Sequence, residues 1–390
     1  MSEPEAKRPI YLDHHSTTPV DPRVLDVMLP YFTEHFGNAA STDHEYGAYA
    51  FTAVEEARRK IAAAIGATPS EIIFTSGATE ADNLAILGVA EQYADRGNHI
   101  ITCVTEHKAV LDTCAYLQGT GWNVTYLPVD RFGIVAPEDV RSAITSKTVL
   151  VSIMTANNEI GTIAPITEIG AITREAGILF HTDATQAIGR IPVDVNSENI
   201  DLLSMSAHKI YGPKGIGTLF VRKLSPRVKV ASQMHGGGHE RGMRSGTLNV
   251  PAIVGFGKAV ELAQFERESE TNRLRTLRDN LLQELQTRIQ GIVIHGHLGY
   301  RLSNNLNVHI PGINNRSLVV QLKHELAIST GSACTTAKVE PSHVLLALGY
   351  NSEHANSSIR FGLGRSTTHQ EILQTSEALV AAICRLRRIV

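Results

Sequence analysis

Short apolar runs, each bounded by turn residues, alternate with helical or turn segments through much of the chain. Runs this short are typical of buried strands, because a helix of comparable burial needs a longer stretch. Strands that alternate with helices form βαβ units, which place the strands in a largely parallel sheet. The predicted strands cover residues 71–75, 99–104, 124–128, 148–154, 177–183 and 201–205.

Helical periodicity and helix-end signals predict the other large elements. One helix begins at Asp21-Pro22 and reaches about residue 35, and a second covers 46–65 and ends at Gly66. A third follows strand 71–75 and continues to about residue 93. A long helix over 251–290 is strongly charged in its second half, which indicates a helix that links two domains. Short strands and two helices are expected between residues 291 and 390.

The chain of 390 residues is long enough for two domains, and the long helix indicates where they divide. We expect an α/β architecture in which a large domain, residues 16–262, holds a mainly parallel sheet between helices. Residues 1–15 and 263–390 are expected to form a smaller α+β domain.

Polar side chains follow several predicted strands at the point where each strand ends. They include His107, Asn158, Asp183, Gln186 and Lys209. An apolar core needs none of them, and functional groups of parallel sheets collect at the carboxyl ends of the strands. We therefore expect these side chains to lie around one site.

Lys209 follows strand 201–205 in the sequence Ser206-Ala-His208-Lys209, with glycines behind it. Burial and cationic neighbours lower the pKa of an amine from its usual value of about 10. An amine tuned in this way can form a Schiff base with an aldehyde. The alternative is a solvated loop lysine, of which Lys214 in the same loop is an example, since no Ser-x-His precedes it.

The segment Ser76-Gly77-Ala78-Thr79 turns a predicted strand into a helix. The free N–H groups at a helix N-terminus bind anions, so this turn is a candidate phosphate site. Ordinary helix capping gives the same pattern, and the two interpretations remain open on this segment alone.

Two further residues stand out in the last hundred. Cys334 lies among Ser, Gly and Thr residues typical of a surface loop, where an exposed thiol indicates a nucleophile. Cys103, Cys114 and Cys384 are better interpreted as small core residues. Arg360 is by default a solvated strand charge, but a bidentate clamp for a carboxylate is the sharper hypothesis.

Metal binding has little support in the sequence. The cysteines lack C-x-x-C spacing, His14 and His15 are interpreted as turn residues, and three glycines between His235 and His239 fix no geometry. The glycine-rich loop 235–247 is instead suited to close approach by a ligand or another subunit.

Composition narrows the class of protein further. A net charge of −3 gives no basic field for nucleic acid or a membrane surface. No run approaches the roughly 18 apolar residues of a membrane span, and the first residues have no apolar signal region. Together with the cysteine pattern, this predicts a cytoplasmic protein without a disulfide framework.

Seven motifs together resemble those of the cysteine desulfurases, the NifS/IscS-type branch of the class V, fold-type I aminotransferase superfamily. The resemblance covers residues 10–385. The motifs are Phe-Thr-Ser-Gly-Ala-Thr-Glu, Thr-Glu-His-Lys-Ala-Val, Asn-Asn-Glu-Ile-Gly, Asp-Ala-Thr-Gln, Ser-Ala-His-Lys-Ile-Tyr-Gly-Pro-Lys-Gly, His-Gly-Gly-Gly-His-Glu-Arg-Gly-Met-Arg-Ser-Gly-Thr and Ser-Thr-Gly-Ser-Ala-Cys-Thr.

The resemblance implies the cofactor pyridoxal 5′-phosphate and a role for each candidate residue. Lys209 binds the cofactor's aldehyde, Asp183 faces the pyridine nitrogen, and His107 stacks on the ring and shuttles protons. Arg360 and Asn158 bind the substrate carboxylate, and Asn158 and Gln186 contact the ring oxygen. The implied phosphate ligands are Ala78, Thr79, Ser206, His208 and, across a homodimer interface, Thr247 of the partner subunit.

The implied reaction takes the sulfur of L-cysteine, leaves a persulfide on Cys334 and releases L-alanine. Acceptors of that sulfur would include an iron–sulfur scaffold protein and carriers for tRNA thiolation. The resemblance implies no resident metal, although Cys334 could serve transiently as an iron–sulfur ligand shared with a scaffold.

Two alternatives remain open. A plain pyridoxal-phosphate aminotransferase or a selenocysteine lyase would keep its turnover without Cys334. A non-catalytic sulfur carrier or scaffold partner on the same fold would lack the cofactor's absorbance, although Lys209, Asp183, His107 and Cys334 are all present.

Overall fold

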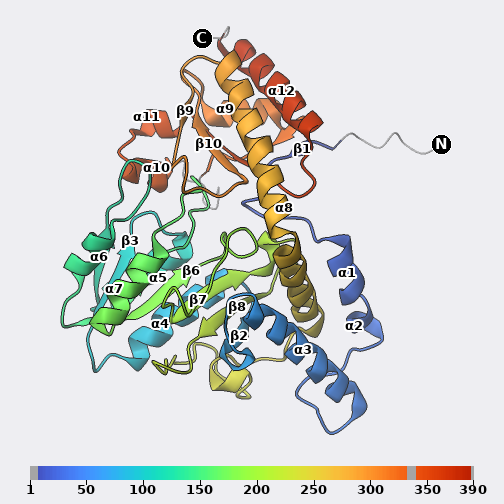
Figure 1. Ribbon diagram of the computed structural model, residues 1–390, viewed down its shortest axis with the longest axis vertical. Coiled ribbons are helices and arrows are strands. Elements are labelled where there is room, and N and C mark those ends of the chain that lie inside the picture. The colour runs from blue at the N-terminus through green and yellow to red at the C-terminus, as the bar shows by residue number, and fades with distance from the viewer. Residues whose placement is uncertain (1–7, 332–339, 388–390) are drawn as a thin grey trace.

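The computed structural model describes residues 8–331 and 340–387 and has two lobes connected by one long helix, α8 (Val250–Arg288) (Figure 1). The lower lobe in this view contains the large sheet, and the upper lobe contains both the first strand and the last helix of the described chain.

Seven strands form the large sheet in the order β2-β8-β7-β6-β5-β3-β4. The strands from β3 to β7 run parallel, while β8 runs antiparallel to both of its neighbours, β2 and β7. The bounds are β2 Ile72–Thr75, β3 His99–Cys103, β4 Asn123–Leu127, β5 Thr148–Ser152, β6 Leu179–Asp183, β7 Leu202–Ser206 and β8 Gly217–Val221. The predicted strands are confirmed, and β8 is an addition to them.

Helices cover both faces of this sheet, and a hydrophobic cluster lies under each layer. On one face, α4 (Ala78–Gln92) and α5 (Lys108–Gly119) pack over residues such as Ile73, Ile100 and Leu150. The other cluster joins α3 (Glu45–Ala63), α6 (Pro137–Ala143), α7 (Ile166–Ala176) and the first part of α8. The result is a sheet buried on both sides, as the apolar strands predicted.

A separate hydrophobic cluster fills the second lobe and includes Leu12, Leu281 and Phe361. The three-stranded sheet β12-β10-β9 is accompanied by a parallel pair, β1-β11, in which the N-terminal segment pairs with residues 326–327. The bounds are β1 Ile10–Tyr11, β9 Val293–Ile294, β10 Asn305–His309, α9 Asn315–Leu322, β11 Leu326–Ala327, α10 His343–Ala347, α11 Ser352–Ala355, β12 Ser358–Gly362 and α12 His369–Arg387.

Two predictions about helices were wrong. The helix expected over 21–35 is divided into α1 (Pro22–Met28) and α2 (Pro30–Thr33), because Pro30 cannot donate the backbone hydrogen bond of a continuous helix. After residue 291 the described chain has four helices where two were expected; α10 and α11 are single turns too short to show periodicity.

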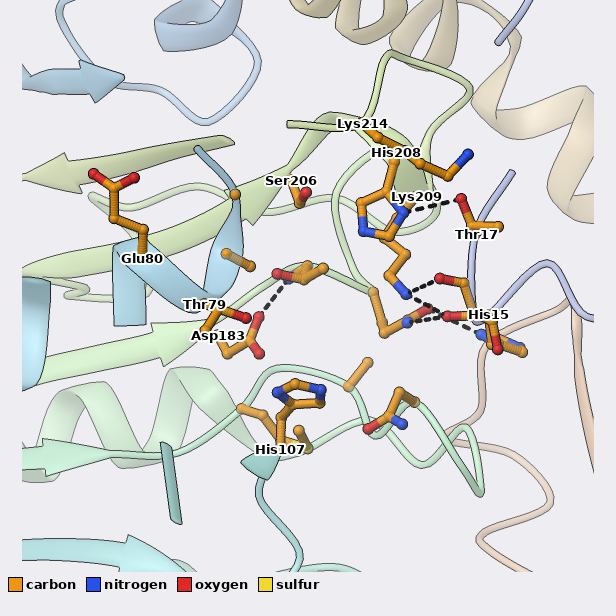
Figure 2. A pocket seen from close by; sticks show the side chains of 18 of the residues that line it. His15, Thr17, Thr79, Glu80, His107, Asp183, Ser206, His208, Lys209 and Lys214 are labelled. Atoms are coloured by element: carbon orange, nitrogen blue, oxygen red, sulfur yellow. Dashed lines mark hydrogen bonds between the residues drawn. The ribbon is translucent and has the colours of Figure 1, made fainter. Parts of the chain in front are cut away.

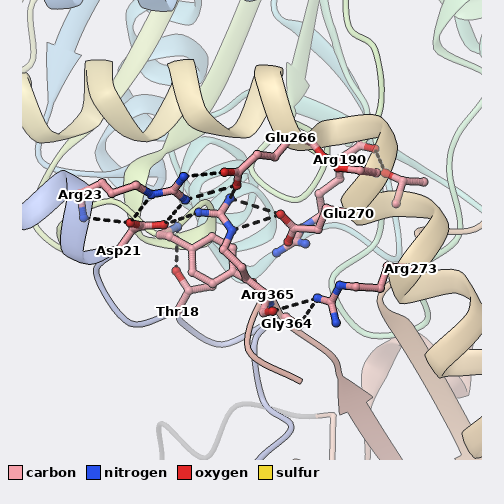
Figure 3. Close-up of polar contacts among 12 residues, drawn as sticks. Thr18, Asp21, Arg23, Arg190, Glu266, Glu270, Arg273, Gly364 and Arg365 are labelled. Atoms are coloured by element: carbon pink, nitrogen blue, oxygen red, sulfur yellow. Dashed lines mark hydrogen bonds and ion pairs between the residues drawn. The ribbon is translucent and has the colours of Figure 1, made fainter. Parts of the chain in front are cut away.

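A network of ion pairs lies beside the middle of α8 (Figure 3). Arg365, from the segment after β12, pairs with Asp21 at the start of α1 and with Glu266 and Glu270 of α8. Arg23 bridges Asp21 and Glu266. The network therefore connects both lobes to the helix that they share.

Among the described helices, none combines the length and the apolar character needed to cross a membrane.

Candidate active site

A cavity of about 580 Å³ opens beyond the carboxyl ends of β3, β5, β6 and β7 (Figure 2). Its wall also includes Ser329, Gly331 and Arg360 from the second lobe, so the cavity lies where the two lobes meet. The predicted site residues that line it are Ala78, Thr79, His107, Asn158, Asp183, Gln186, Ser206, His208, Lys209 and Arg360.

Lys209 ends η2 (Ala207–Lys209), a single 3-10 turn that directly follows β7. Its Nζ donates hydrogen bonds of 2.6 Å to the carbonyl oxygens of His15 and Ser16. Burial, and next the charge of Arg360, lower the pKa of the amine to about 8, against the opposing effect of Asp183. The neutral, nucleophilic form is therefore accessible near physiological pH.

Asp183 is the last residue of β6 and lies 6 % exposed at the cavity. Its Oδ1 accepts a hydrogen bond of 2.9 Å from the backbone N–H of Thr185, which fixes the carboxylate. Figure 2 shows this carboxylate and the His107 ring pointing into the same space as the Lys209 amine. His107 caps α5, since its Nδ1 accepts from the backbone N–H of Ala109 at 3.2 Å.

The N-terminus of α4 opens toward the cavity without a capping side chain, because its N-cap is Gly77. The first N–H groups of a helix have no partner within the helix, so those of Ala78 and Thr79 are available to an anion. His208 lines the same cavity, and its Nδ1 lies 3.1 Å from Thr17 Oγ1. Burial, Lys209 and Lys214 lower the pKa of His208 to about 4, so this ring is neutral at pH 7.

Arg360 lies 4 % exposed in the middle of β12. One Nη donates to Asp13 Oδ1 at 2.8 Å and to Ser16 Oγ at 2.9 Å, and the other donates to the carbonyl oxygen of Asn158 at 3.1 Å. Its Nε is buried and has no hydrogen-bond partner among the described residues. A fixed guanidinium with a spare donor suits a bound carboxylate.

Sequence reasoning missed several residues of the N-terminal segment. His15 was interpreted as a turn residue, but it lies 1 % exposed in the cavity wall, where its Nδ1 is 2.9 Å from Gln186 Oε1. Gln186 Nε2 in turn donates to the carbonyl oxygen of His15. Lys214, taken as a solvated loop lysine, also lines the cavity. No local pattern marks His15, because pairing between β1 and β11 brings the N-terminal segment to the cavity.

Two predicted site residues are not part of this wall. Thr247 is exposed and lies outside the cavity of its own subunit. Cys334 lies outside the described residues. Within the described ranges, no group of three or more His, Cys, Asp or Glu side chains is arranged to hold a metal ion.

Comparisons with known proteins agree with this fold. Residues 10–374 match the family model described as aminotransferase class-V. A protein named cysteine desulfurase IscS from Anaeromyxobacter sp. (strain Fw109-5) is 52 % identical over 383 residues, which cover 98 % of this chain and 94 % of the relative.

Two solved structures extend the comparison. A NifS-like protein matches with a TM-score of 0.90 and 38 % identity, over 97 % of this chain and all of its own. A structure described as SspA in complex with cysteine matches with a TM-score of 0.80 and 37 % identity, over 91 % of this chain and 98 % of its own.

The chain belongs to the class-V aminotransferase family, which works with pyridoxal phosphate. Within that family, it belongs with the cysteine desulfurases of the NifS/IscS type, to which it is similar over nearly its whole length. The predicted fold class, enzyme class and cofactor are confirmed.

The cavity fits this cofactor on its own chemistry. It offers an amine of lowered pKa on Lys209, a buried carboxylate on Asp183 and uncapped helix N–H groups at Ala78 and Thr79. These are the three groups needed for an aldehyde, a pyridine nitrogen and a phosphate, respectively.

Proposed function

We propose that this chain removes the sulfur atom of L-cysteine, releases L-alanine and holds the sulfur as a persulfide on Cys334. The observation that carries the proposal is one cavity that brings Lys209 and Asp183 together with an uncapped helix terminus and the buried Arg360. Bound pyridoxal phosphate supplies an electron sink for negative charge at the substrate's α-carbon.

The residues of the chain would divide the remaining work. Lys209 binds the cofactor's aldehyde and, once released, moves protons at its Nζ, for which a pKa of about 8 is well suited. Asp183 would hold a proton on the ring nitrogen, and His107 would transfer protons. Gln186, held by His15, contacts the ring oxygen.

Phosphate and substrate would bind at opposite ends of the cavity. Ala78, Thr79, Ser206 and His208 form the phosphate end, and Arg360 with Asn158 forms the end that takes the substrate carboxylate. In support, the buried Nε of Arg360 has no partner among the described residues, so a carboxylate would satisfy it. The thiolate of Cys334 then attacks the substrate sulfur, whose bond to carbon breaks as the persulfide bond forms.

We also propose a homodimer in the cytoplasm. In support, the segment from α2 through the start of α3 (residues 30–51) exposes large aromatic side chains, among them Phe36 at 64 % and Tyr46 at 58 %. Thr247 lies outside its own cavity, and in a dimer it would complete the phosphate end of the partner's site. Sulfur acceptors would include an iron–sulfur scaffold protein, which could share Cys334 as a transient iron–sulfur ligand, and carriers for tRNA thiolation.

The test is incubation of the cofactor-loaded protein with L-cysteine and a reductant, with alanine, sulfide and the visible spectrum measured together. We expect alanine and sulfide in equal amounts. Cys334→Ala should keep the bound-cofactor absorbance and lose persulfide formation, and Lys209→Ala should lose turnover while remaining folded.

The competing activities give different results in the same assay. An aminotransferase or a selenocysteine lyase would keep its turnover in Cys334→Ala. Undiminished sulfide release by Lys209→Ala would show that the site assignment is wrong.

A further inference from the structure

Glu159 is a buried carboxyl that the proposed reaction does not use. It lies 2 % exposed in the loop after β5, next to Asn158. Its backbone N–H donates to Asn157 Oδ1 at 2.8 Å. Its carbonyl oxygen accepts hydrogen bonds of 3.1 Å from the side-chain amides of both Asn305 and Asn307. The second lobe therefore holds the backbone of Glu159 in one position through β10.

The side chain of Glu159 reaches the chain that leads to Cys334. A Cβ atom built on Gly331 would lie only 2.6 Å from Glu159 Oε1, so the carboxyl lies directly against this glycine. The φ of Gly331 is +87°, a conformation that also favours glycine. Oε1 is buried and has no hydrogen-bond partner among the described residues. Such an oxygen is unusual in a folded protein and calls for an explanation.

The chain that leaves the Cys334 segment returns to the same carboxyl. Ser342 caps α10 by accepting the N–H of Leu345 on its hydroxyl, and it lies close enough to Glu159 to lower the pKa of that carboxyl. Gly331 and Ser342 are thus described residues on either side of Cys334, and both lie next to one side chain. Arg360 is also close by. It donates a hydrogen bond to the carbonyl oxygen of Asn158, the residue before Glu159.

We propose that Glu159 is a positioning residue for sulfur transfer, whose carboxyl fixes Gly331 and Ser342 relative to the carboxylate end of the cavity at Asn158 and Arg360. This inference rests on the proposed function, because it concerns how Cys334 is presented to the substrate. A misplacement of reacting groups by about 1 Å costs roughly 100-fold in rate, so a residue that sets this placement has a large effect without touching the substrate.

The charge of Glu159 is sensitive to pH near neutrality. Burial raises the pKa of its carboxyl to about 7, while the Ser342 hydroxyl and the positive charge of Arg360 act in the opposite direction. Its other polar neighbours, the amides of Asn305 and Asn307, do not titrate. We therefore expect the rate of sulfur transfer to Cys334 to rise as Glu159 ionises around pH 7, in addition to the change that Lys209 causes near pH 8.

The experiment compares Glu159→Gln with the wild-type holoenzyme. Glutamine keeps the shape of the side chain and removes its titration. The rate of persulfide formation on residue 334 is measured by mass spectrometry in a single turnover between pH 5.5 and 9. In parallel, the rate of alkylation of Cys334 by iodoacetamide is measured without L-cysteine, which reports on the thiol segment independently of turnover.

We expect Glu159→Gln to retain cofactor absorbance and thermal stability, to form persulfide about tenfold more slowly at pH 8, and to lose the inflection near pH 7 in both measurements. Glu198→Gln is the matched control, because burial raises the pKa of Glu198 to about 7 as well, but its charged neighbour is Asp194, whereas Glu159 lies beside Arg360 and Gly331. Ser342→Ala serves as a second variant, which should slow persulfide formation if Glu159→Gln does not fold.

The outcomes separate this inference from the proposed function. If the wild-type protein forms no persulfide on residue 334, the proposed function fails. If the wild-type protein forms it and both Glu159→Gln and Ser342→Ala have the same rates and pH profiles as wild type, the positioning role of Glu159 is overturned. A slower rate with an unchanged pH profile and a matching loss of cofactor also overturns it, because that result reports only structural damage.

Discussion

At the residue scale, Lys209 combines two strong hydrogen bonds with an environment that disfavours its charge. The carbonyl oxygens of His15 and Ser16 orient the amine, while burial and Arg360 lower its pKa to about 8. Orientation and reactivity therefore come from different parts of the chain: the N-terminal segment supplies the acceptors, and β12 supplies the positive charge.

This environment predicts how the apoenzyme amine responds to pH. Because its pKa is about 8, the neutral fraction of Lys209 should rise between pH 7 and 9 and level off above that range. Competitive acylation of the apoenzyme, followed by mass spectrometry of the Lys209 peptide, gives the titration midpoint. A midpoint above pH 10 would contradict the assigned environment.

Asp82 is a second buried carboxyl, on α4 behind the site. Its side chain is fully buried, neither oxygen has a hydrogen-bond partner among the described residues, and His181 Nε2 is 3.6 Å away. Burial, and next the negative charge of Asp183, raise its pKa well above the usual value. We therefore expect Asp82 to be protonated at pH 7, which leaves Asp183 as the carboxylate that faces the cavity.

The raised pKa of Asp82 has a definite sign in stability. The folded protein binds a proton that the unfolded chain releases near pH 4, so the free energy of unfolding falls as pH rises from 4 toward the folded pKa. The Asp82→Asn variant has no carboxyl to ionise at this position, so its free energy of unfolding should not fall with pH for this reason. The difference in Tm between Asp82→Asn and the wild-type holoenzyme should increase from pH 5 to pH 8, as measured by calorimetry at each pH. An equal difference at all pH values would contradict a protonated Asp82.

At the element scale, α8 belongs to both hydrophobic clusters. Its first part, including Val250 and Ala263, packs in the cluster under the large sheet, and its later part, including Leu274 and Leu285, packs in the second lobe. The polar residues between them carry the ion-pair network (Figure 3). This arrangement supports a domain division at about residue 262, which we propose with residues 16–262 as one domain and residues 1–15 and 263–390 as the other.

The exposed aromatic side chains of residues 30–51, from α2 through the start of α3, give a prediction for assembly. Phe36 is 64 % exposed and packs against Tyr46, which is 58 % exposed, and such a face is unfavourable in a monomer. Phe36→Glu should shift the protein from dimer to monomer in sedimentation and weaken cofactor retention, because Thr247 of the partner subunit would be lost. Phe265→Glu, at a phenylalanine of α8 that is 88 % exposed, is the control and should remain dimeric.

Particular elements show how far the sequence predicts this protein. The parallel strands and the polar residues at their ends follow from local pattern, so Asp183, His107 and Lys209 could be assigned to one site. Pro30 is a local signal that was overlooked. The strand β8 follows a glycine-rich exit and runs antiparallel, so no βαβ pattern marks it. The burial of His15 depends on pairing with a distant strand, which no local pattern contains.

At the scale of the whole molecule, the two lobes are held together by charge as well as by α8. Arg365 is the centre of the network, with partners on α1 and α8, and it lies 4.3 Å above the ring of Tyr211 from the large lobe. A lysine cannot make the paired contacts of a guanidinium.

Substitution of Arg365 should therefore loosen the contact between the lobes. We expect Arg365→Lys to lower the free energy of unfolding by roughly 2 kcal/mol, the value of a charge-assisted hydrogen-bond pair. Calorimetry of the holoenzyme should show a lower Tm and a broader transition. Arg288→Lys, at an exposed pair within α8, should leave the transition unchanged.

The pairing of β1 with β11 brings together residues more than three hundred positions apart. The acceptors of the Lys209 amine, His15 and Ser16, lie just beyond β1 and reach the large sheet only when that pairing exists. During synthesis on the ribosome, the large sheet would emerge complete while its lysine still lacked these partners. Nascent chains arrested before residue 326 should therefore fail to acquire yellow colour from added pyridoxal phosphate, and the final sixth of translation becomes the step that commits the enzyme to its holo form.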